Sequence, residues 1–129
     1  MQLDDIRSFS ADQDRGSWFD LLDPVTGQAT GIRLKLAGPD SELQNRARLR
    51  LADDLSEVAD AEGRVSAEAR ERARIDSLAR CILAWEVSED GQPLPFTHAN
   101  VVRLLKAAAW VQAQVDGFAS DRAAFRRAV

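Results

Sequence analysis

The stretch Ile32-Arg33-Leu34-Lys35-Leu36 alternates strictly between apolar and basic side chains. Because successive side chains of a β-strand point to opposite faces, this period of two predicts a half-buried strand with its apolar residues inward. The preceding run Ser-Trp-Phe-Asp-Leu-Leu is separated from it by Asp-Pro and Thr-Gly steps, which favour turns. We therefore predict a β-hairpin over residues 17–37. A hairpin alone is marginally stable in water, so it must pack against other elements.

A helical pattern begins directly after this strand. Asp40 or Ser41 is suited to cap the helix, because either side chain can accept a main-chain N–H. Apolar side chains then recur at spacings of three and four, which predicts an amphipathic helix that ends at Gly63. Ser66 caps a second helix, and we predict an antiparallel helical hairpin over residues 41–85. The apolar stripe of its second helix consists of Ile75, Leu78, Ala79, Ile82 and Trp85.

The remaining segments complete one α+β domain that is mainly helical. Residues 1–16 form an acidic arm that we expect to be mobile or loosely docked. Residues 86–96 combine an Asp-Gly step with two prolines, which predicts an extended turn segment. Residues 97–129 predict C-terminal helices, the first of them capped by Thr97. The predicted fold is an N-terminal β-hairpin packed on an antiparallel helical hairpin plus C-terminal helices.

Composition narrows the class of protein. A chain of 129 residues is the length of one domain, and its 45% of apolar residues is typical of a globular protein. One histidine and one cysteine cannot form the usual zinc site or a disulfide within one chain. The chain has neither a secretory signal nor an apolar run near the ~18–20 residues that span a bilayer, so we expect no membrane association. Cys81 lies in an apolar stretch and predicts a reduced core thiol in a cytosolic protein.

No motif in the sequence supports catalysis or cofactor binding. His98 has no serine, cysteine or carboxylate at a diagnostic spacing, and the seven glycines do not form a phosphate-binding loop. Asp12 and Asp14 resemble the start of a calcium loop, but Ser17 and Asp23 stand where glycine and glutamate are needed. We therefore expect a protein that is not an enzyme and holds no cofactor or metal.

The charge pattern also argues against nucleic acid as a partner. Between Gln44 and Arg80 the chain has eight arginines and eight acidic residues, and the whole chain carries a net charge of −4. A helix that binds nucleic acid would not usually interleave its arginines with as many carboxylates. This region therefore predicts a solvated helix face with opposite-charge pairs.

Large apolar residues concentrate in the C-terminal third. They either form a core over the end of the helical hairpin or line an exposed groove for a partner helix, and the two can coexist in a small adaptor. The candidates for partner binding are Trp85, Leu94, Phe96, Val101, Leu105, Trp110, Phe118 and Phe125.

The same third of the chain resembles a known family. The run Trp85-Glu-Val-Ser-Glu-Asp-Gly-Gln-Pro-Leu-Pro-Phe-Thr-His-Ala-Asn-Val-Val-Arg-Leu-Leu105 is similar to small tail proteins of long-tailed bacteriophages and prophages, most of all to tail assembly chaperones. Downstream, Trp110 and a Phe-x-x-Asp-Arg-x-x-Phe signature ending at Phe125 continue the similarity. One departure is Ala109, where relatives often have proline, and we expect the helix to run on there without a kink. The matching residues are Trp85, Asp90, Gly91, Pro93, Pro95, Phe96, Thr97, Asn100, Val101, Leu104, Leu105, Trp110, Val115, Phe118, Asp121, Arg122 and Phe125.

This resemblance implies a non-catalytic tail assembly chaperone in the host bacterial cytoplasm. Such a protein binds the tape-measure protein and keeps that long helical chain soluble until tail-tube subunits polymerise around it. Contact with the tail-tube protein and self-association stay open. Two alternatives also stay open: a minor structural tail or connector protein of the virion, and a prophage-encoded DNA-binding regulator, for which the arginines at positions 122, 126 and 127 are the candidate basic face.

Overall fold

A computed structural model describes residues 1–126 of the chain. It confirms an α+β fold that is mainly helical, with a small antiparallel sheet. The helices are α1 (Leu3–Arg15), α2 (Glu42–Val58), α3 (Ala67–Ala79), α4 (His98–Ala107), α5 (Ala109–Ala119) and the 3₁₀ turn η1 (Arg122–Phe125). The strands are β1 (Ser17–Leu22), β2 (Ala29–Leu36), β3 (Ile82–Glu86), β4 (Ser88–Glu89) and β5 (Gln92–Pro93).

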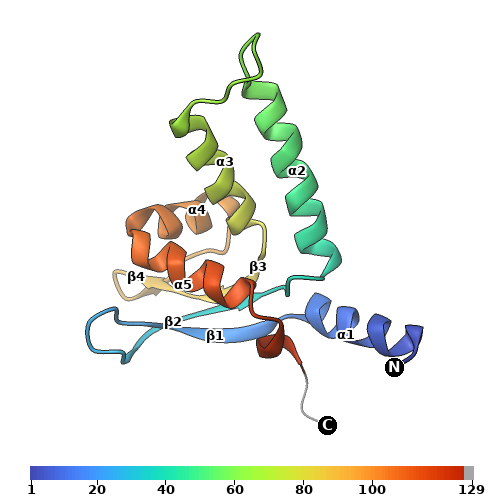
Figure 1. The fold of residues 1–129 in the computed structure, drawn as a ribbon. Helices are drawn as coiled ribbons and strands as arrows, with labels where there is room; N and C mark the ends of the chain where they lie inside the picture. Colours follow the sequence, from blue (N-terminus) through green and yellow to red (C-terminus); the bar gives the residue numbers. More distant parts are fainter. Residues whose placement is uncertain (127–129) are drawn as a thin grey trace.

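The main sheet has the order β1-β2-β3, and both pairings are antiparallel. Figure 1 shows α3, α4 and α5 on one side of this sheet and α1 beyond its end. The alternation at residues 32–36 confirms the predicted strand, since Leu34 and Leu36 are fully buried while Arg33 and Lys35 occupy the opposite face. The register aligns Phe19, Leu34 and Trp85 in one row on the helix-covered face.

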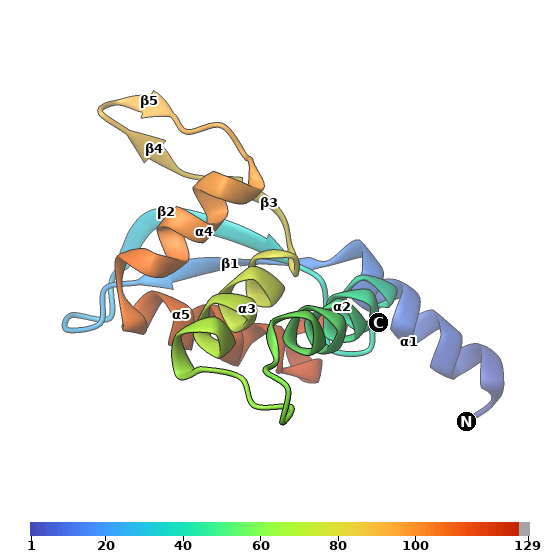
Figure 2. The same ribbon diagram turned by 90° about the horizontal axis from the view of Figure 1, so that it is seen from above.

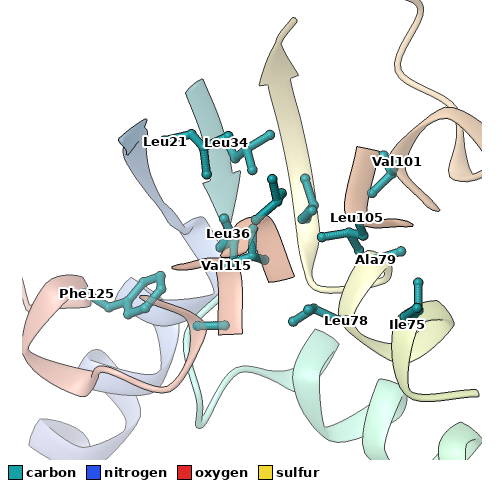
Figure 3. Packing of buried hydrophobic residues seen from close by; sticks show 13 residues of the cluster. Leu21, Leu34, Leu36, Ile75, Leu78, Ala79, Val101, Leu105, Val115 and Phe125 are labelled. Atoms are coloured by element: carbon teal, nitrogen blue, oxygen red, sulfur yellow. The ribbon is translucent and has the colours of Figure 1, made fainter. Parts of the chain in front are cut away.

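The core lies between the sheet and the helices. Figure 3 shows Leu34 and Leu36 of the sheet pointing toward Leu105 and Val115 from the helices. Leu21 and Phe125 are also fully or almost fully buried. The hairpin is therefore stabilised by packing on the helical layer, as its marginal stability in isolation required.

The third strand corrects the sequence prediction. Residues 82–85 were expected to extend the second helix of the hairpin, but α3 ends at Ala79 and Ile82–Glu86 pairs with β2. A short apolar run fits a buried helix turn and a buried strand equally well. The strand wins because Ile82 pairs with Leu36 and Trp85 with Leu34, which satisfies the free edge of β2.

Three helix boundaries also differ from expectation. The acidic arm contains helix α1, whose Gln13 is fully buried. Helix α2 ends at Val58, before Gly63, because the Asp60 carboxylate accepts main-chain N–H groups of the following turn. The helix expected to run through Ala109 is interrupted at Ala108, which is extended (φ −161°, ψ 146°).

The interruption at Ala108 has a geometric reason. A continuous helix over residues 98–119 would be about 33 Å long, whereas a strand of five to eight residues spans only about 17–27 Å. Breaking the helix lets α4 pack beside α3 while α5 turns back to contact β1. The predicted caps are confirmed: Ser41, Ser66 and Thr97 each accept a main-chain N–H at the start of their helices.

Candidate functional site

The most exposed part of the predicted partner-binding set is an aromatic cluster at the end of β3. The Trp85 ring meets the Phe96 ring edge to face, with centroids 5.6 Å apart. The Trp85 indole Nε1–H donates to the main-chain oxygen of Leu94 at 3.0 Å. Phe96 is 46% exposed, and Trp85 and Leu94 are half-buried. The cluster therefore exposes the apolar ring of Phe96 to solvent, and the contact with Trp85 holds that ring in place.

A groove adjoins this cluster between α4 and the small hairpin β4–β5. Figure 2 shows the hairpin standing apart from the sheet on the side of α4. The apolar lining comes from three parts of the chain: Ile32 of β2, Val87 and Leu94 at the base of the hairpin, and Leu104 of α4. We call this hollow the α4 groove. Its polar and small lining residues are Ser88, Glu89, Asn100, Arg103, Lys106 and Ala107.

The hairpin that forms one wall is shaped by its turn. Asp90 and Gly91 both have positive φ (52° and 77°), which is the backbone of a tight turn between β4 and β5. At its base the Leu94 N–H donates to the Val87 oxygen at 2.8 Å. Across the groove the Arg103 guanidinium pairs with the Glu89 carboxylate. The Asp-Gly step predicted the turn, but the sequence did not show that the β4–β5 hairpin forms one side of the α4 groove.

The other predicted binding residues lie elsewhere. Val101, Leu105 and Phe125 are at most 2% exposed and belong to the core, so they offer no surface to a partner in this structure. Phe118 is half-buried between two rings: it stacks on Phe19 at 4.7 Å and meets Phe125 edge to face at 5.3 Å. Phe19 and Trp85 stand at opposite ends of the same inward row of the sheet.

Trp110 completes the set at the start of α5. It is half-buried and packs against the core cluster. The predicted set of eight is thus divided between the core, an inner aromatic stack and the exposed cluster. Of the eight, only Leu94 lines the α4 groove, and Trp85 and Phe96 adjoin it because the Trp85 indole is hydrogen-bonded to Leu94.

Sequence reasoning missed several residues of the groove. Ile32 and Val87 come from strands or their ends, and Leu104 and Arg103 occupy the α4 face that includes Asn100 at i, i+3 and i+4 spacing. The helical spacing of the α4 residues was visible in the sequence. The approach of Ile32 to this helix was not, because it depends on the packing of the sheet against α4.

Two titratable side chains considered in the sequence analysis, Cys81 and His98, do not line the α4 groove. Burial raises the pKa of the Cys81 thiol to about 11, so the thiolate that would act as a nucleophile is disfavoured. His98 is exposed, with Nε2 3.3 Å from Asp76 Oδ1. Among residues 1–126, no three His, Cys, Asp or Glu side chains gather as a metal site, and no helix is long and apolar enough to cross a membrane.

Comparison with known proteins identifies the origin of the chain. The sequence profile of a family described as YdaY prophage protein matches residues 40–129. The chain belongs to the YdaY prophage protein family. The matched region runs from the start of α2 through β3, the β4–β5 hairpin and all C-terminal helices, so it contains every α4-groove residue except Ile32. No curated protein and no solved structure shows significant similarity to this YdaY-family chain.

Proposed function

We propose that this YdaY-family protein is a tail assembly chaperone that binds helical segments of the phage tape-measure protein in the host cytoplasm, without catalysis. The observation that carries the proposal is the exposed Phe96 ring, which packs on the half-buried Trp85 and adjoins the α4 groove through Leu94. A partly exposed aromatic next to an apolar groove is typical of protein-binding sites. The prophage family and the resemblance of residues 85–125 to tail assembly chaperones favour this partner.

The charge of the chain also suits this role. A net charge of −4 favours solubility of a complex that keeps an aggregation-prone helical chain in solution. One shallow groove supports only weak binding of one segment. Many copies along one long target would compensate, because each bound copy shields a different segment from aggregation.

A DNA-binding role receives less support from the C-terminal arginines. The Arg122 guanidinium forms two hydrogen bonds to the Asp40 carboxylate, at 2.7 and 2.9 Å. The Arg126 guanidinium lies over the Phe9 ring at 5.7 Å. Arg127 lies outside the described residues. Because the Asp40 carboxylate neutralises Arg122 and the Phe9 ring covers one side of Arg126, the predicted basic face offers less free charge to DNA.

The direct test is binding of tape-measure fragments from the same prophage, measured by biolayer interferometry. Phe96→Ala removes the exposed ring and should weaken binding about tenfold, as expected for loss of an aromatic anchor worth more than 1 kcal/mol. Val25→Ala is the matched control, since Val25 is 90% exposed at the far hairpin tip. Each variant is first checked for an unchanged melting temperature.

Three results would redirect the proposal. Equal binding by wild type and well-folded Phe96→Ala would remove the Trp85–Phe96 cluster from the binding site. Stoichiometric amounts of the protein in purified virions would favour a minor structural tail or connector protein instead. Salt-dependent retention on DNA would favour the regulator.

A further inference from the structure

The rim of the α4 groove has the opposite charge to the rest of the chain. Arg103 and Lys106 lie three residues apart on α4, and both line the groove. Glu89, on the facing hairpin, is the acidic lining residue. The groove therefore carries one excess positive charge in a chain whose net charge is −4. Within the part of the chain that the structure describes, Lys106 makes no ion pair.

The ion pair across the groove is easily exchanged. The Arg103 and Glu89 side chains are 56% and 51% exposed, and ion pairs this open to water contribute little to stability. The hairpin that carries Glu89 is a ladder of two residue pairs, Ser88 with Pro93 and Glu89 with Gln92. So short a ladder is weakly held, so the tip of the hairpin can move away from α4 at low cost while its base stays fixed by the Asn100 side chain, which donates to the Pro95 oxygen at 2.9 Å.

The shape of the groove indicates the conformation of its occupant. Asn100, Arg103, Leu104 and Ala107 follow each other at the i, i+3, i+4 and i+7 positions of one helix face. A face of this kind packs best against the ridges of a second helix laid along it. The apolar floor then requires an apolar stripe on that helix, and the two rim cations require a carboxylate beside the stripe.

We infer that the α4 groove selects amphipathic helices that carry a carboxylate next to their apolar stripe, and that Glu89 is an internal competitor for the same cation, Arg103. This inference rests on the proposed function and specifies which segments of the partner are bound. An incoming carboxylate replaces Glu89 on Arg103 and gains Lys106, while the tip of the β4–β5 hairpin moves aside. Segments that carry lysine at the same positions are disfavoured by like-charge repulsion.

Three designed helical peptides test the inference. They share one apolar stripe and differ only in the two flanking positions, which hold Glu, Gln or Lys, and binding is followed by fluorescence anisotropy of a labelled peptide. We expect the Glu peptide to bind about fivefold more tightly than the Gln peptide, the gain from one exposed ion pair. The Lys peptide should bind most weakly, and 0.5 M salt should remove the differences.

Variants separate the roles of the two charged residues. Glu89→Gln frees Arg103 and should tighten the Glu peptide severalfold without changing the Gln peptide. Arg103→Gln should reduce the preference for Glu over Gln, since Lys106 still lines the groove. Glu86→Gln is the matched control, because Glu86 is similarly exposed but pairs with Arg33 on the other face of the sheet. Its binding should equal that of the wild type.

The possible failures are distinguishable. Equal binding of the three peptides, with Glu89→Gln and Arg103→Gln both silent, would overturn charge selection and leave the proposed apolar groove standing. Failure of all three peptides and of the tape-measure fragments to bind would overturn the groove itself. Tighter binding of the Lys peptide would overturn the inferred sign of the selection.

Discussion

Gln13 anchors helix α1, and replacing it should release that helix from the domain. Gln13 is fully buried although it is polar. Its Oε1 accepts the main-chain N–H of Asp40 at 2.5 Å, and its Nε2 donates to the Asp40 carboxylate at 3.1 Å. Its main-chain oxygen also accepts the Gly38 N–H at 3.0 Å. The first half of α1 is exposed, including Leu3 and Ile6, so the helix is held by its second half, through the Gln13 bonds and the Asp14 carboxylate, which accepts the Glu42 N–H at 2.7 Å.

The expected cost of Gln13→Ala follows from the bonds that it removes. A neutral hydrogen bond contributes about 1 kcal/mol net, and one to a charged group about 1.5–3 kcal/mol. Asp40 is exposed and keeps its two bonds to Arg122, so water can replace part of the loss. We therefore expect about 2 kcal/mol, which raises the undocked population of α1 about thirtyfold.

Hydrogen exchange followed by mass spectrometry measures this release directly. Peptides covering residues 3–15 should lose protection in Gln13→Ala, while peptides covering the core helix α5 should keep it. Gln28→Ala is the control, because Gln28 lies in an exposed loop. If exchange of α1 changes by less than twofold, Gln13 does not anchor the helix and the reasoning is wrong.

Two further predictions concern the helix break and the buried thiol. Ala109 is the first residue of α5 and follows an extended residue, and both features suit proline. Ala109→Pro should therefore leave the free energy of unfolding unchanged or raise it by about 0.4–1 kcal/mol. A drop of more than about 1 kcal/mol in a denaturant titration would contradict the break at Ala108. Burial raises the folded pKa of the Cys81 thiol from 9.0 to about 11, so between these pH values the unfolded thiol has lost its proton and the folded one has kept it. Stability should therefore fall across pH 9–11, by about 2–3 kcal/mol in total, and Cys81→Ala should remove that part of the slope in urea titrations at pH 8, 9.5 and 11. An identical slope in the variant would show that another group is responsible.

Local chemistry explains why much of the fold was predictable. A strand that alternates strictly in polarity has one side to bury, so residues 32–36 specified both strand and inward face. Ser41, Ser66 and Thr97 act through hydrogen bonds to main-chain groups three residues away, and these caps need no tertiary partner. Helix α1 could also have been predicted, since Leu3, Ile6 and Gln13 follow helical spacing. The residue that is buried, Gln13, is polar, and so the spacing was not recognised as the inward face of a helix.

The candidate site was predictable only in part. The sequence located apolar residues between 85 and 125 but could not divide core from surface, because both are apolar and both follow helical spacing. Val101 and Leu105 point into the core, whereas Leu104 between them lines the groove. The apolar pattern of α4 is compatible with more than one orientation of this helix about its own axis. The contact with the sheet selects the rotation.

The sequence by itself determined the local elements of this protein: the alternating strand, the helix caps, the Asp-Gly turn and the lack of residues for a zinc site of the usual type. Each depends on main-chain geometry or residue chemistry within a few positions. The tertiary structure alone decided that residues 82–86 pair with β2, that the last helices break at Ala108, and that Ile32 meets α4. These features bring together residues that are far apart in the chain, such as Leu36 and Ile82, and their energies come from packing that no local pattern encodes.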